Sequence, residues 1–176
     1  MKKLFLFLLL ISHVYIFAQE EYDNILKEIE PQVQKISASR KFSTAEQKEF
    51  CADTTRIELF MQKAIEVLSY PSDRAMANIT QHAIYLCDKL LNKYYKKLQN
   101  ELNNDQKQKL LNAQRNWITF MDKEKELISS LYSNPNCMDN TGRSYLLSSH
   151  TIFLAIKKRT IELFSHYMTV KYYSCG

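Results

Sequence analysis

Apolar residues recur every three or four positions through four long segments of the chain, which is the spacing of one helix face. The pattern predicts helices over 43–69, 73–102, 106–132 and 144–170. In the third helix, the apolar face consists of Leu110, Ala113, Trp117, Phe120, Leu127 and Leu131. In the fourth helix, a seven-residue repeat aligns Leu147, Leu154, Ile161 and Met168.

Capping and turn residues set the ends of these helices. Ser43 and Glu46 have the spacing of a capping box at the first helix, and Pro71 stops that helix. Ser72 or Asp73 caps the second helix. Residues 103–105 form a short break, and 133–144 form the clear long loop of the chain.

The N-terminal residues have the pattern of a secretory signal peptide over 1–18: a basic start, an apolar run and a small residue, Ala18, at its end. A retained N-terminal anchor is the alternative. Apolar residues at helical spacing predict a helical segment over 19–42. We expect a break at Pro31 and a loop over 37–40.

Short connections between long amphipathic helices favour antiparallel neighbours. The predicted fold is therefore all-α: an antiparallel up-down bundle of about four long helices over 43–176, preceded by the extra N-terminal helical segment. The sequence has only two glycines and three prolines. This composition excludes glycine-rich phosphate loops, a glycine-flanked nucleophile elbow and the closely spaced turns of a β-sandwich.

The charge balance does not indicate a nucleic-acid partner. The chain carries 24 Lys and Arg against 19 Asp and Glu, for a net charge of +5, which becomes +3 once Lys2 and Lys3 leave with the signal peptide. A charge this small affects solubility rather than marking a nucleic-acid surface. Export also places the protein in the periplasm or outside the cell.

Four cysteines lie after the signal peptide, and an even number in an exported chain favours two disulfides. Pairing of the first two is geometrically allowed and leaves the last two to pair with each other. The rival scheme joins the first to the fourth and the second to the third, and four buried thiols are the other alternative. The cysteines are Cys51, Cys87, Cys137 and Cys175.

A hairpin of the helices over 73–102 and 106–132 would align a row of polar residues along one seam. Asp88, Asn92, Gln114, Arg115 and Asp122 make up this row, beside Tyr95 and Trp117. We interpret the row as a hydrogen-bond network that fixes helix register, with Trp117 in the core. The sequence predicts no catalytic, cofactor-binding or metal-binding residue.

The same residues carry a family resemblance. An aspartate, a leucine-asparagine pair and a tyrosine precede an alanine-glutamine-arginine-x-tryptophan box, a second aspartate and a closing arginine. This pattern over about 76–165 resembles the LprI-like lysozyme inhibitor N-terminal domain family. Its positions here are Asp88, Leu91, Asn92, Tyr95, Ala113, Gln114, Arg115, Trp117, Asp122 and Arg159. The chain departs from the family at Met121, Lys125 and Thr151, where the family has an arginine and two cysteines.

The resemblance implies an exported, non-enzymatic protein that binds another protein, with lysozyme as the named target, and that uses no cofactor. Two alternatives remain open at this stage. One is an envelope hydrolase or other enzyme that uses Asp88, Asn92, Gln114 and Asp122. The other is a structural envelope protein that associates with its own kind.

Overall fold

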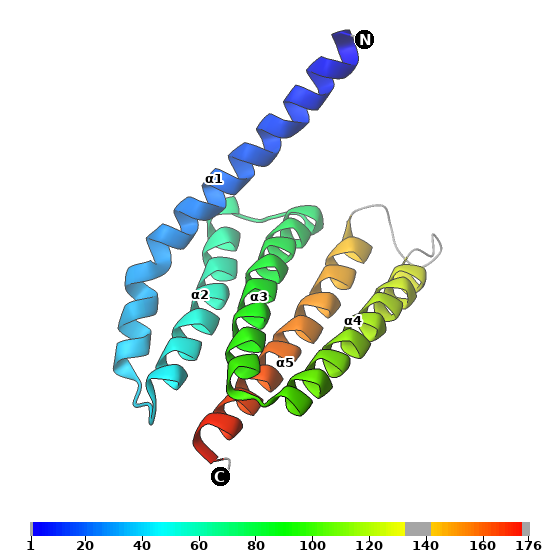
Figure 1. The fold of residues 1–176 in the computed structure, drawn as a ribbon. Coiled ribbons are helices and arrows are strands. Elements are labelled where there is room, and N and C mark those ends of the chain that lie inside the picture. The colour runs from blue at the N-terminus through cyan, green and yellow to red at the C-terminus, as the bar shows by residue number, and fades with distance from the viewer. Residues whose placement is uncertain (1, 133–141, 174–176) are drawn as a thin grey trace. The chain divides into compact units, whose positions relative to one another are not determined.

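A computed structural model describes the backbone of residues 2–132 and 142–173, with side chains over 20–131 and 142–173. Within these ranges the chain forms five helices and no strand (Figure 1), so the predicted all-α fold is confirmed. The chain divides into two compact units, Met1–Ser69 and Tyr70–Gly176. The helices are α1 Lys2–Ser39, α2 Ala45–Leu68, α3 Asp73–Glu101, α4 Asn104–Tyr132 and α5 Arg143–Tyr173.

The bounds of α2 to α5 confirm the four helices predicted from the apolar pattern. Ser72 caps α3, as expected, by accepting a hydrogen bond from the backbone N–H of Ala75 at 3.2 Å. At α2 the cap lies one residue later than predicted, because the Thr44 hydroxyl accepts from the N–H of Gln47 at 3.2 Å. Of the predicted loop over 133–144, residues 133–141 lie outside the described part of the chain.

The predicted break at Pro31 and the loop over 37–40 are wrong, because α1 continues through Pro31 to Ser39. A proline inside a helix removes one backbone hydrogen bond and crowds the preceding turn. Ile29 and Val33 are buried on either side of it, and packing of α1 on α2 holds the helical path. The Ser37 hydroxyl donates back to the carbonyl of Gln34 at 3.0 Å, which extends the helical pattern.

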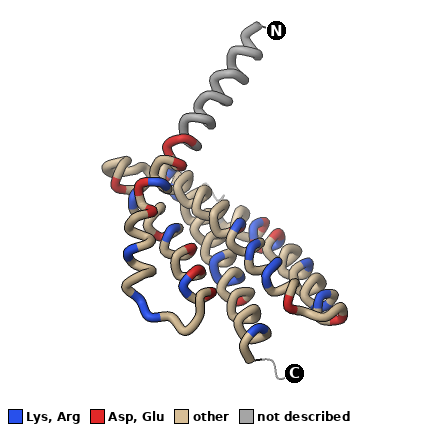
Figure 2. The backbone as a smooth tube through the Cα atoms, turned by 60° about the vertical axis from the view of Figure 1, so that its left-hand side comes forward, with Lys and Arg blue, Asp and Glu red and all other residues tan. Residues whose placement is uncertain are grey.

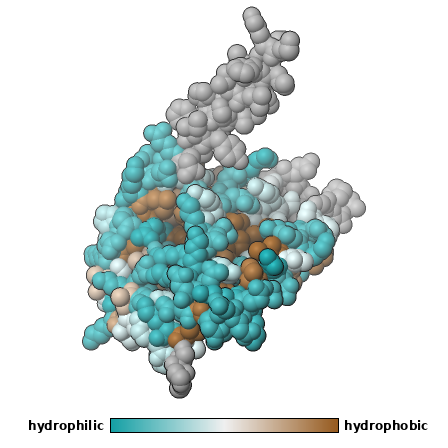
Figure 3. Space-filling view, in the orientation of Figure 1, coloured by the Kyte–Doolittle hydropathy of each residue, from teal (hydrophilic) through white to brown (hydrophobic). Residues whose placement is uncertain are grey.

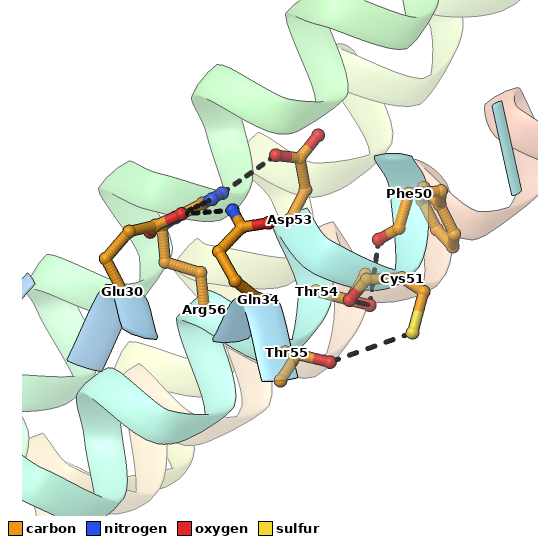
Figure 4. Close-up of polar contacts among 8 residues, drawn as sticks. All are labelled: Glu30, Gln34, Phe50, Cys51, Asp53, Thr54, Thr55 and Arg56. Carbon is orange, nitrogen blue, oxygen red and sulfur yellow. Dashed lines mark hydrogen bonds and ion pairs between the residues drawn. The ribbon is translucent and has the colours of Figure 1, made fainter. Parts of the chain in front are cut away.

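The first unit is a hairpin of α1 and α2, held by apolar packing and a cluster of ion pairs (Figure 4). Tyr22 packs edge-to-face on the buried ring of Phe60, with ring centres 5.4 Å apart. Arg56 donates from Nε and Nη2 to the two carboxylate oxygens of Glu30, at 2.8 and 3.0 Å. These hydrogen bonds hold the pKa of Glu30 below its ordinary value and raise the pKa of Arg56. A third donor, Nη1, bonds Asp53 at 2.9 Å.

The second unit is built on α3 and α5, which run parallel and pack along their length. Near their N-terminal ends, Gln81 donates to the hydroxyl of Ser149 at 2.9 Å. Near their C-terminal ends, the buried ring of Tyr94 lies 5.1 Å from the ring of Phe164 and 6.4 Å from that of Tyr167. These contacts form the core of the unit.

The helix α4 runs antiparallel to both and lies against α5, so that α5 lies between α3 and α4 (Figure 1). Although only a short connection separates them, α3 and α4 hardly touch. Met121 and Ile128 are the buried side chains of α4 within residues 104–131. The up-down order along the chain is as predicted, but the neighbour of α4 is α5 rather than α3.

Candidate functional site

The structure does not bring together the polar seam predicted between α3 and α4. Asn92 is exposed and donates within its own helix to the carbonyl and carboxylate oxygens of Asp88, at 2.9 and 3.1 Å. On α4, the exposed Asp122 pairs with Lys125 three positions later at 3.6 Å. The predicted hydrogen-bond network between α3 and α4 is therefore wrong for Asn92 and Gln114, because α5 rather than α3 faces this part of α4.

Gln114 instead joins α4 to α5. Its side-chain oxygen accepts a hydrogen bond from Nε of Arg159 at 3.2 Å. The Arg159 side chain is only 13% exposed, and its Nη1 lies 3.2 Å from a carboxylate oxygen of Glu162 one turn later. Two residues of the family pattern thus form one polar contact across the helix pair.

The other family-pattern residues have mixed surroundings. Leu91 is buried in α3, and Tyr95 is half-buried beside it. Ala113 and Arg115 are exposed on α4. Trp117 is half-buried, so its predicted place in the core is wrong: it lies on α4, which packs sparsely on its neighbour.

The buried line of α4 also differs from the predicted one. Gln114, Met121 and Ile128, seven residues apart, face α5 and are half-buried or buried. Phe120 is 56% exposed, Leu127 49% and Leu131 60%. We call Phe120, Leu127 and Leu131 the α4 apolar stripe; all three lie on one flank of the helix. Figure 3 shows hydrophobic residues interrupting a largely hydrophilic surface.

Charge is distributed unequally along the chain. Residues 19–69 carry seven basic and ten acidic residues, whereas residues 70–176 carry fifteen basic and nine acidic residues. A shallow hollow on α1 is lined by Glu20, Glu21, Asn24, Ile25 and Glu28. Figure 2 shows acidic residues in red where the described side chains of α1 begin. Burial, helped by the charge of Glu21, raises the pKa of the neighbouring Tyr22.

Two of the four cysteines lie in the described part of the chain. Cys51 and Cys87 are both buried. Nη1 of Arg40 donates a hydrogen bond to Sγ of Cys51 at 3.3 Å. Cys137 and Cys175 lie outside the described residues, so the pairing of the cysteines stays a prediction.

Within the described residues, no group of three or more His, Cys, Asp or Glu side chains could hold a metal ion. In the same part of the chain, no helix is long and apolar enough to cross a membrane. The polar residues that were candidates for chemistry lie on two helices, α3 and α4, which hardly touch each other. The second unit instead presents α4, a helix with an exposed apolar flank. Exposed apolar surface of this kind is typical of protein–protein interaction sites.

Comparison with known protein families identifies the group to which this helical protein belongs. The family model described as lysozyme inhibitor LprI matches residues 69–163, and the chain belongs to this family. The match covers α3, α4 and the first two thirds of α5, which confirms the resemblance drawn from the tryptophan box. No curated protein and no solved structure matches the chain.

Proposed function

We propose that this chain is an exported, non-enzymatic protein that binds lysozyme and inhibits it by protein–protein contact. Its family is described by lysozyme inhibition, and the matched segment is the second unit almost to its end. The signal-peptide pattern over 1–18 supports export. Dispersal of Asp88, Asn92, Gln114 and Asp122 supports a non-catalytic role, because acid–base catalysis needs convergent groups.

The single observation that carries the proposal is the α4 apolar stripe. Phe120, Leu127 and Leu131 all lie inside the matched segment, and each is about half exposed. Single exposed apolar side chains are ordinary, but three large ones on one flank of a helix are typical of a docking surface. Large apolar and aromatic side chains at the centre of an interface supply most of its binding energy.

A lysozyme assay with surface variants tests the proposal. We expect the chain starting at Gln19 to slow the clearing of a cell-wall suspension by lysozyme. The double variant Phe120→Ser with Leu127→Ser should raise the inhibition constant at least ~30-fold, because each side chain is a candidate anchor worth about 1 kcal/mol or more. Its helical content should be unchanged, since both side chains are already exposed.

The matched control changes two apolar residues of similar exposure on another helix, Leu154→Ser with Ile161→Ser on α5. This variant should inhibit lysozyme like the unchanged chain. Equal loss of inhibition in both variants would place the contact elsewhere, and no inhibition by the unchanged chain would reject the proposal. Intact-mass measurement of the exported protein tests the cleavage after Ala18, and retention of residues 1–18 would contradict it.

A further inference from the structure

The outward face of α5 combines apolar and basic side chains. Leu154, Lys157, Lys158 and Ile161 follow one another at positions i, i+3, i+4 and i+7, which places them on one face of a helix. Leu154 is 50% exposed and Ile161 46%. Lys158 is exposed between them. We call these four residues the α5 basic-apolar face.

Leu154, Lys158 and Ile161 lie away from the helices that pack on α5, whereas Lys157, seven residues before Phe164, lies at the edge of this face toward α3. The contact with α4 is made by Arg159, and the contacts with α3 are made by Ser149, Phe164 and Tyr167. Leu154 and Ile161 lie on a different side of the helix from Arg159 and Tyr167, as the period of 3.6 residues per turn requires. No helix of the second unit therefore covers the α5 basic-apolar face within the described residues.

The C-terminal turns of α5 also carry basic and aromatic side chains. Lys171 donates to the hydroxyl of Tyr167 at 3.0 Å, and its ammonium lies 5.7 Å from the centre of the Tyr172 ring. Tyr172 is exposed. From Leu154 to Tyr172 the helix rises ~27 Å, so basic, aliphatic and aromatic groups follow one another over five turns.

The charge of α5 has one sign on this side. The helix contains five basic residues and a single acidic residue, Glu162. The Glu162 carboxylate bonds Arg159 at 3.2 Å, on the side that faces α4. The α5 basic-apolar face therefore presents positive charge and exposed aliphatic groups, with no acidic residue among its members.

We propose that the α5 basic-apolar face binds the surface of an anionic lipid bilayer. Leucine and isoleucine side chains enter the boundary between headgroups and acyl chains, while lysine stems are long enough to keep their ammonium groups among the phosphates. Tyrosine favours the same interfacial layer. Negative surface charge of the bilayer complements the lysines. This surface is separate from the α4 apolar stripe, so one molecule could hold its protein target close to a membrane.

Vesicle co-sedimentation tests the proposal with the chain starting at Gln19, which lacks the apolar segment 4–17. The tertiary contacts of α1 described above begin at Tyr22, so this chain keeps them. We expect binding to vesicles of equal parts phosphatidylglycerol and phosphatidylcholine, and little to phosphatidylcholine alone. Binding should weaken as salt is raised.

Two double variants locate the contact. Lys157→Gln with Lys158→Gln should lower the affinity for anionic vesicles roughly 30-fold, at about fivefold per lysine near the bilayer. Leu154→Ser with Ile161→Ser should lower it roughly tenfold or more, because the aliphatic insertion is lost. Both variants should keep helical content, since they change exposed or half-exposed side chains.

Matched controls lie on α4. Lys109→Gln with Lys123→Gln removes the same charge from two exposed lysines, and Leu127→Ser removes an equally exposed leucine. These variants should bind anionic vesicles like the unchanged chain. Equal loss in the α4 and α5 lysine variants would show attraction by net charge alone and would overturn the proposal. Binding to polyglutamate but not to anionic vesicles would overturn it in favour of an acidic protein partner.

Discussion

Nε of Arg159 on α5 lies 3.2 Å from the side-chain oxygen of Gln114 on α4, although 45 positions separate the two residues in the chain. Both belong to the family pattern, and their hydrogen bond is a specific polar contact between two helices that otherwise touch sparsely. Because the Arg159 side chain is largely buried, the loss of its partner cannot be fully compensated by water. We therefore propose that the glutamine of the tryptophan box fixes α4 against α5.

The first prediction compares Gln114→Ala with Asn92→Ala. Gln114→Ala should lower the free energy of unfolding by about 1–3 kcal/mol, because it removes a hydrogen bond to a charged, largely buried group. Asn92→Ala should change it by less than about 0.5 kcal/mol, since Asn92 is exposed and bonds only within its helix. Denaturant titration monitored by the fluorescence of Trp117, the single tryptophan, reports on α4 directly. Equal losses of unfolding free energy in the two variants would instead support the polar seam between α3 and α4 that the sequence predicted.

The second prediction compares Trp117→Ala with Leu163→Ala. Leu163 is fully buried in the core between α3 and α5, so its truncation should cost about 2–5 kcal/mol. Trp117 is half-buried, so its truncation should cost less, about 1–2 kcal/mol, by the smaller apolar area that it hides from water. Thermal melting followed by far-ultraviolet circular dichroism measures both. A larger loss for Trp117→Ala would place that side chain in the core after all.

The third prediction concerns pH and the first unit. Arg56 holds the pKa of Glu30 below its ordinary value, so the ion pair stabilises the folded unit above that ordinary value, ~4.3. This stability is lost as the pH falls from there through the lowered pKa, because the folded state must then take up a proton that it binds weakly. The pair is partly exposed, which limits its contribution to about 1 kcal/mol.

Glu30→Gln should remove that contribution at neutral pH and flatten the pH dependence below it. Hydrogen exchange of the α1 and α2 amides across a pH series, corrected for intrinsic rates, measures the effect within this unit. Glu20→Gln, which neutralises an exposed glutamate on the same helix, is the control. If both variants leave the same pH profile, the pair with Arg56 does not stabilise the unit.

The sequence predicted the helices well and their neighbours poorly, for identifiable reasons. Periodic apolar residues and caps such as Ser72 act locally, and the bounds of α3 follow from them. The side of α4 that is buried cannot be predicted from such local signals, because apolar residues occupy much of the circumference of this helix. Whether Phe120 or Met121 is buried depends on which helix lies beside α4, and that helix is α5. The partner of Gln114 was missed for the same reason, although Arg159 had been noted as a family position.

Pro31 shows a second limit of sequence reasoning. Its local preference is to start or break a helix, at a cost of ~3 kcal/mol in a helix interior. The structure keeps the helix because Ile25, Ile29 and Val33 all pack on α2, and a break would misalign them. That burial depends on a second helix many positions away, so no pattern within α1 could reveal that it outweighs the proline.

The parallel packing of α3 and α5 has a consequence for how the second unit folds. The contact between Gln81 and Ser149 spans 68 positions. The ring of Tyr94 packs on Phe164 and Tyr167, which are also on α5 and are synthesised about 70 positions later. A growing chain that ends after α4 lacks the principal partner of α3, and the α3–α4 hairpin offers few contacts in its place. Loop closure over such distances slows folding, because its entropy cost precedes any gain from packing. The core of this unit can therefore close only after the last helix has been made.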